Sequence, residues 1–128
     1  MNLEKKAWGT AKTGETVYRY TLSNKNGMSV DVCNVGCSIL SIIVPDRNGV
    51  PTDVALAYGT CEDYNRNPAS FGCVVGRYGN RIAGGRFRFA GKTWQLEQNE
   101  GKNHLHGASG AYRRRFWPVS EESADGLT

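Results

Sequence analysis

Short runs of alternating apolar and polar residues, separated by turn-forming residues, are the feature that most constrains how this chain can fold. Residues 16–22 (TVYRYTL) and 28–35 (MSVDVCNV) each alternate with a period of two, and Asn26-Gly27 lies in the turn between them. An Asn-Gly pair between two alternating runs is typical of a β-hairpin, because both residues tolerate the left-handed conformation that tight turns need. The sequence therefore predicts an antiparallel hairpin over residues 16–35.

The rest of the chain carries further strand-like segments. Residues 86–89 and 93–96 flank Ala90-Gly91-Lys92, a three-residue connection that suits a second hairpin. Residues 62–65 favour one helical turn, because the period of two is lost before Pro68. The pattern as a whole predicts an all-β, mainly antiparallel β-sandwich in a single domain of residues 1–128. The other expected strands are residues 37–44, 54–58, 71–75 and 112–119.

The charge distribution argues against a nucleic-acid partner. The chain has 16 Lys and Arg against 12 Asp and Glu, but only Arg113-Arg114-Arg115 form a run. Neighbouring residues on a strand point to opposite faces, so this run would not make one continuous basic patch. A membrane partner is not expected either, because no apolar run reaches the ~18 residues of a transmembrane helix. The first residues lack the apolar stretch of a secretory signal, which predicts a cytoplasmic protein.

The four cysteines, Cys33, Cys37, Cys61 and Cys73, lack the spacing of a metal site. On an extended strand, Cys33 and Cys37 would lie about 13 Å apart, which is too far for both to bind one zinc ion. No C-x-x-C pair is present either. We therefore expect reduced, buried thiols and no bound metal.

Residues 76–107 place polar side chains at both ends of one short β unit. Asn80 and Arg81 follow a glycine-spaced turn, and Asn103, His104 and His106 lie in the loop that closes the stretch. Arginine supplies a planar fork of donors, asparagine both donors and an acceptor, and histidine a group that titrates near neutrality. Hydroxyl-rich ligands call for this mixture. The alternative is a twisted hairpin with solvated polar ends, and composition alone leaves both interpretations open.

Two linked motifs in this stretch resemble the aldose 1-epimerase (galactose mutarotase) family. The residues GRYGNRIAGGRF match the family's G-R-x-x-N-R-I-x-x-G-x-F segment, and KNHLHG matches its N-x-L-H-G segment at a similar separation. A weaker likeness extends upstream through Asn34-Val35-Gly36 and Val44-Pro45-Asp46. The resemblance covers most of this chain but only about the first third of the family's fold. It implies an incomplete galactose mutarotase-like domain, part of a large twisted β-sandwich.

The resemblance also implies an activity, the interconversion of the α and β anomers of an aldohexose such as galactose or glucose. This reaction needs a base for the C1 hydroxyl and an acid for the ring oxygen, but no cofactor. Carried over by motif, Asn80, Arg81 and His106 would bind the sugar, with His106 positioning and polarising it. The family's second histidine, its glutamate base and a sugar-binding aspartate lie further downstream in the family pattern, beyond Thr128. The chain alone is therefore expected to be inactive or very weak.

The remaining polar residues near the motifs have simpler interpretations. His104 is interpreted as an exposed loop histidine, and Ala108 stands where the family often has a second glycine. The nearby carboxylates are interpreted as solvated surface charge: Glu97, Glu100, Glu121 and Glu122.

Two other functions stay open. The chain could be a carbohydrate-binding module without chemistry or, with less support, a basic β-domain for nucleic acid. An incomplete sandwich would also leave open sheet edges, which predicts self-association.

Overall fold

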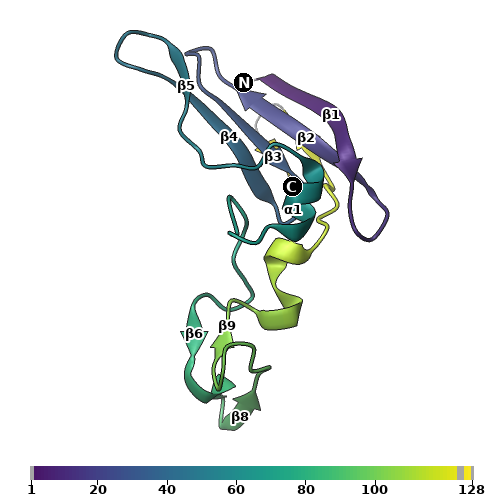
Figure 1. Ribbon diagram of the computed structural model, residues 1–128, viewed down its shortest axis with the longest axis vertical. Helices are drawn as coiled ribbons and strands as arrows, with labels where there is room; N and C mark the ends of the chain where they lie inside the picture. Colours follow the sequence, from purple (N-terminus) through teal and green to yellow (C-terminus); the bar gives the residue numbers. More distant parts are fainter. Residues whose placement is uncertain (1, 124–125, 128) are drawn as a thin grey trace. The chain divides into compact units, whose positions relative to one another are not determined.

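The computed structural model describes residues 2–123 and 126–127 (Figure 1). These residues form two compact units, one holding the chain up to Val74 together with the segment from Arg113, and the other holding Val75–Tyr112. We call them the sheet unit and the motif unit. The predicted single domain over residues 1–128 stays a prediction.

The sheet unit is built on an antiparallel sheet whose strand order follows the chain, β1-β2-β3-β4-β5 among the described residues. The predicted first hairpin is confirmed, since β2 pairs with β3 over Arg19 to Ser23. The turn between them is closed by Asn24, whose Oδ1 accepts the backbone N–H groups of Asn26 at 2.9 Å and Met28 at 3.1 Å. The strands span Asn2–Thr10 (β1), Thr16–Ser23 (β2), Ser29–Cys33 (β3), Ser38–Pro45 (β4) and Pro51–Asp53 (β5).

The helix α1 (Cys61–Arg66) contributes Cys61 and Tyr64 to the core of the sheet unit. Thr60 caps its start by accepting the Asp63 N–H, and Asn67 ends it in a left-handed conformation. Tyr64 is 1% exposed and its hydroxyl donates to the Ile39 carbonyl at 3.2 Å, so the helix is anchored on β4. The predicted helical turn at residues 62–65 is thus confirmed. The buried core residues are Ala11, Val17, Cys33, Val35, Leu40, Cys61 and Tyr64.

Three of the predicted strands are wrong, namely residues 54–58, 71–75 and 112–119. Residues 54–58 do not extend β5, because the Asp53 carboxylate accepts the N–H groups of Ile42 and Ala55 and turns the chain away. Residues 71–75 do not form a strand, although Gly72 accepts from Ile39 and Val74 donates to Gly36. Gly72 has a φ of +63°, which interrupts the extended backbone that a strand needs.

The third wrong strand is residues 112–119. The first part forms a 3₁₀ helix at Tyr112–Arg114 (η3), and only a single bridge, Val35↔Phe116, follows it. Backbone bonds on either side of this bridge, from Gly36 to Arg115 and from Trp117 to Asn34, hold the segment against residues 34–36. The pairing is too short to count as a strand.

Near the end of the described chain, β10 (Glu122–Ser123) pairs with β11 (Gly126–Leu127).

The motif unit consists of two short antiparallel pairs. β6 (Arg81–Ile82) pairs with β9 (His104–Leu105), and β7 (Arg86–Phe89) pairs with β8 (Lys92–Gln95). The predicted second hairpin is confirmed, but its connection has two residues instead of three. Ala90 and Gly91 both have positive φ, +49° and +74°, as a tight hairpin turn requires. Two 3₁₀ helices complete the unit, η1 (Ala83–Gly85) and η2 (Ala108–Gly110).

The cysteines behave partly as expected. All four are free thiols among the described residues, but Cys37 is exposed, so the prediction that all are buried is wrong. Burial raises the pKa of Cys33 to about 11, which keeps this thiol protonated at neutral pH. No helix in the described residues is long and apolar enough to cross a membrane.

Candidate functional site

Asn80 and His106 hold each other at the end of the β6–β9 pair. The Asn80 N–H donates to His106 Nδ1 at 2.9 Å, and the His106 N–H donates to the Asn80 carbonyl at 3.1 Å. Both residues have positive φ, +50° and +49°. Since Nδ1 accepts a backbone N–H, the imidazole proton must lie on Nε2. His106 therefore offers an Nε2–H donor from an exposed side chain.

Arg81 forms a close ion pair with Glu100. Arg81 Nε lies 2.8 and 2.9 Å from the two carboxylate oxygens of Glu100, and Nη2 lies 2.5 Å from Oε1. This hydrogen bonding raises the pKa of Arg81 and lowers the pKa of Glu100. On its other side, Arg81 Nη1 donates to Asn80 Oδ1 at 3.3 Å. The interpretation of Glu100 as simple solvated charge is thus wrong.

The loop after β9 has a backbone that few sequences tolerate. His106, Gly107 and Ala108 have φ of +49°, +83° and +51°. A Cβ at Gly107 would lie 2.2 Å from the Gly76 carbonyl oxygen, so only glycine fits there. Ala108 adopts the left-handed conformation that a second glycine would take more easily.

Glu97 holds the far side of this loop. Its Oε2 accepts the N–H of Ser109 at 3.1 Å and also the Ser109 hydroxyl. Glu97 is a surface charge, as the sequence predicted, but it also has a structural contact with Ser109. The side chain itself remains exposed. Its contacts tie the segment after β8 to the loop that carries His106.

His104 is an interior residue of the motif unit. It is only 4% exposed, its Nδ1 lies 2.7 Å from the Glu97 carbonyl oxygen, and Tyr78 packs edge-on against it at 5.8 Å. The carbonyl can only accept, so Nδ1 carries the proton. Its interpretation as an exposed loop histidine is wrong. In a regular strand His104 and His106 would share a face, but the left-handed φ at His106 breaks this alternation.

With this geometry established, comparison with known proteins identifies the family. The family model for aldose 1-epimerase matches residues 18–128. The chain belongs to the aldose 1-epimerase family. Among curated relatives, the galactose mutarotase of Mus musculus is 39% identical over 104 residues, which cover 81% of this chain and 30% of the relative. The aldose 1-epimerase of Escherichia coli K12 is 33% identical over 113 residues, covering 88% of this chain and 33% of the relative.

Solved structures of epimerases agree with this membership. The galactose 1-epimerase of Lactobacillus acidophilus superposes with a TM-score of 0.79 at 26% identity, covering 96% of this chain and 36% of that structure. The aldose epimerase homologue of C. elegans gives 0.75 at 30% identity, covering 81% and 32%. The predicted all-β, antiparallel mutarotase-like fold is thereby confirmed. This chain spans about a third of the length of these epimerases.

The sequence motifs of the epimerase family thus correspond to one cluster in the motif unit. The three predicted sugar-binding residues are linked by Asn80, which contacts both Arg81 and His106. Their binding of a sugar stays a prediction. The motifs did not reveal Glu100, because its spacing from Arg81 follows no local pattern.

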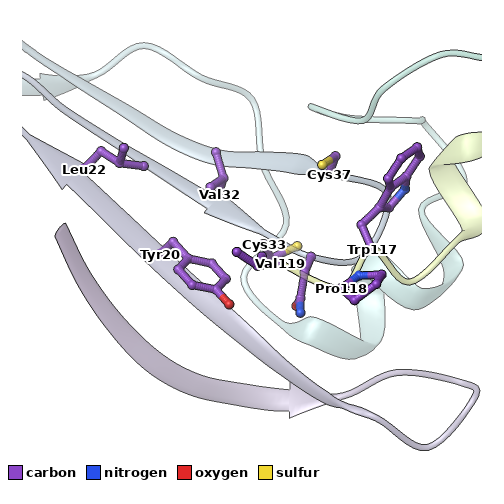
Figure 2. Close-up of a pocket in the computed structure, with 9 residues that line it drawn as sticks. Tyr20, Leu22, Val32, Cys33, Cys37, Trp117, Pro118 and Val119 are labelled. Atoms are coloured by element: carbon purple, nitrogen blue, oxygen red, sulfur yellow. The ribbon is translucent and has the colours of Figure 1, made fainter. Parts of the chain in front are cut away.

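A separate cavity of about 300 Å³ lies in the sheet unit (Figure 2). Its walls come from β2, β3 and the segment 117–119, and Trp117 and Pro118 stand at one end of it. None of its lining residues is charged, and it includes none of the predicted sugar-binding residues. They are Tyr20, Leu22, Val32, Cys33, Asn34, Cys37, Trp117, Pro118 and Val119.

Proposed function

We propose that this chain supplies the sugar-positioning part of an aldose 1-epimerase that interconverts the α and β anomers of an aldohexose such as galactose or glucose. The observation that carries this proposal is the pairing of Asn80 with His106, which leaves an Nε2–H donor exposed on the imidazole. Arg81, which contacts Asn80, adds a charged donor to the same cluster. Relatives named galactose mutarotase support the choice of substrate class.

The chemistry assigns different tasks to different groups. A base removes the proton of the C1 hydroxyl while an acid protonates the ring oxygen, so the C1–O5 bond breaks and an open-chain aldehyde forms. Rotation about C1–C2 exposes the other face of the aldehyde, and the reverse proton transfers close the ring. No electrons are gained or lost overall. The reaction therefore needs a proton-transfer pair and groups that hold the sugar.

His106 suits the holding task better than the proton transfer. Its Nδ1 accepts from Asn80, so the ring is neutral and its one proton is on Nε2. Giving that proton to the ring oxygen would leave an imidazolate anion, which is very unfavourable. Donating a hydrogen bond from Nε2–H instead polarises the C1–O5 bond and fixes the orientation of the ring. The acid and the base are groups that the family resemblance assigns outside residues 1–128.

Two groups can bind the sugar hydroxyls beside His106. Arg81 keeps its Nη1 hydrogens on the side away from Glu100, and its side chain is 55% exposed. The Asn80 amide supplies both donors and an acceptor. Hydroxyl groups accept and donate, so this set can bind a vicinal pair of them.

A sugar titration of the 128-residue chain followed by NMR tests this proposal. Galactose should shift resonances of the motif unit. Replacing Arg81 or His106 by Ala should each weaken binding by roughly 1–3 kcal/mol, the range for a hydrogen bond involving a charged or buried polar group. Arg47→Ala, which alters an exposed arginine in the β4–β5 turn, is the matched control and should bind as the unaltered chain does.

The double variant gives the decisive result. Full galactose affinity in Arg81→Ala, His106→Ala would overturn the site assignment. Specific binding without any acceleration of anomer exchange, even in a chain that includes the downstream acid and base, would instead favour a non-catalytic carbohydrate-binding module.

A further inference from the structure

The Arg81–Glu100 ion pair has a geometry that selects which donors remain for a ligand. Glu100 binds the edge of the guanidinium formed by Nε and Nη2, through three contacts of 2.5–2.9 Å. The opposite edge, at Nη1, contacts only the neutral Asn80 amide at 3.3 Å among the hydrogen bonds of the described residues. The two edges of one guanidinium therefore have different surroundings, one anionic and one neutral.

Glu100 is held in place by the backbone around it. The Glu100 N–H donates to the Asn103 carbonyl at 3.1 Å, and the Asn103 N–H donates back to the Glu100 carbonyl at 2.9 Å. The Asn103 side chain in turn accepts the N–H of Gly84, in the 3₁₀ helix that directly follows β6. Since β6 carries Arg81, these contacts close a ring from Arg81 through Gly84, Asn103 and Glu100 back to Arg81. The carboxylate is thus directed at the guanidinium by the fold.

This ion pair contributes little to folding stability. The side chains of Arg81 and Glu100 are 55% and 34% exposed, and ion pairs between solvent-accessible side chains are only weakly stabilising. Its stronger effect is on binding, because an arginine already fixed in one orientation loses less conformational freedom when a ligand arrives.

The pair also decides which ligand chemistry is favoured. A phosphate or carboxylate binds arginine best through two parallel hydrogen bonds to one edge of the guanidinium. At Arg81 the edge formed by Nε and Nη2 is already occupied by Glu100. The end-on edge between Nη1 and Nη2 shares Nη2 with this carboxylate, so an anion bound there would be repelled by its negative charge at close range. A sugar hydroxyl has neither difficulty, because it is neutral and needs only one donor from the Nη1 edge.

Resting on the sugar-binding function proposed above, we infer that Glu100 is a positioning and specificity-determining residue. It orients Arg81 toward sugar hydroxyls and makes the site favour neutral sugars over sugar phosphates.

The test compares galactose with galactose 6-phosphate on the ¹⁵N-labelled 128-residue chain. The variant is Glu100→Gln, which keeps the size of the side chain and removes its charge. The matched control is Glu62→Gln, which removes an exposed ion pair of the same kind with Arg66 on α1, in the sheet unit. Affinities for both sugars come from NMR titrations, and the Arg81 Nε–H resonance reports the ion pair directly.

The unaltered chain and the Glu62→Gln control should bind galactose more tightly than galactose 6-phosphate. In Glu100→Gln the affinity for galactose 6-phosphate should rise relative to that for galactose by about five- to hundredfold. The reason is that the variant removes one negative charge at contact distance from Arg81 in a partly exposed site. The Arg81 Nε–H resonance should shift in Glu100→Gln and stay unchanged in the control.

The other outcomes separate the two proposals. An unchanged ratio in Glu100→Gln, with galactose still bound, overturns the role of Glu100 and leaves the proposed function standing. An equal loss of affinity for both sugars in Glu100→Gln, together with a large fall in melting temperature, means that Glu100 has a purely structural role. This result also overturns the inference. Absence of any galactose binding in the unaltered chain overturns the proposed function, and the inference with it.

Discussion

Replacing Gly107 by Ala should loosen the His106 loop by more than backbone strain alone can explain. Gly107 has a φ of +83°, and a side chain in this left-handed region costs roughly 1–2 kcal/mol. The new Cβ would also lie 2.2 Å from the carbonyl oxygen of Gly76, which accepts the Tyr112 N–H at 3.1 Å. Relieving the contact moves that carbonyl and loses a hydrogen bond of about 0.5–1.5 kcal/mol. The total is about 1.5–3.5 kcal/mol.

Gly91→Ala is the matched control for this variant. Gly91 lies in the same motif unit and has a similar φ of +74°, but no described atom beyond its chain neighbours lies within 4 Å of an added Cβ. It should therefore cost only the backbone strain, about 1–2 kcal/mol. The difference between the two variants isolates the contact with the Gly76 carbonyl.

Amide hydrogen exchange followed by NMR measures this difference locally. The Tyr112 and His106 amides should exchange about fivefold or more faster in Gly107→Ala than in Gly91→Ala, since about 1 kcal/mol corresponds to a factor of five. The His106 Nδ1 resonance should move as its bond from Asn80 weakens. Equal exchange rates in the two variants would show that the Gly76 contact does not constrain the His106 loop.

Four further predictions follow from the fold and the site. Ala90→Asn should raise the unfolding free energy by about 0.5–1 kcal/mol in denaturant melts, because Asn tolerates the left-handed φ of this hairpin turn; no gain would contradict the turn assignment. The Glu100 carboxyl should titrate below its ordinary value of 4.5 and return to it in Arg81→Ala, so the ion pair is intact at neutral pH and is lost as pH falls through the lowered pKa; an unshifted NMR titration would exclude the pair. The 128-residue chain should accelerate the mutarotation of α-galactose little beyond buffer in polarimetry, and a strong rate abolished by His106→Ala would mean that an acid and a base are present after all. Edge strands β1 and β5 should promote self-association, and a sharply melting monomer in light scattering would count against it.

Local patterns were enough to predict the hairpins and the family motifs. The alternation of residues 16–22 and 28–35, with Asn24 closing the turn, depends on contacts within a few residues of each other. The same holds for the Ala90-Gly91 turn, where the missing Cβ of Gly91 and the paired strands decide the conformation. The motifs at Arg81 and His106 predicted which residues gather in the motif unit. Sequence alone was sufficient where neighbours along the chain determine the structure.

Strand limits and burial depended on partners far away in the chain. Residues 71–75 look like a strand and do bond to Ile39 and Gly36, but the positive φ of Gly72 prevents a regular ladder. His104 looks like a polar loop residue, yet the carbonyl of Glu97 and the ring of Tyr78 bury it. The charged β1, at the edge of the sheet, was not expected because its residues show little apolar alternation.

The candidate site also depended partly on local sequence and partly on the tertiary structure. The sequence predicted that Asn80, Arg81 and His106 bind a hydroxyl-rich ligand, and that binding stays a prediction. Only the tertiary structure brought the Asn80 N–H onto His106 Nδ1, 26 residues away, and Glu100 onto Arg81, 19 residues away. These contacts decide which imidazole nitrogen carries the proton and which edge of the guanidinium is available. A hydrogen bond depends on distance and direction in space, and the folded backbone sets both.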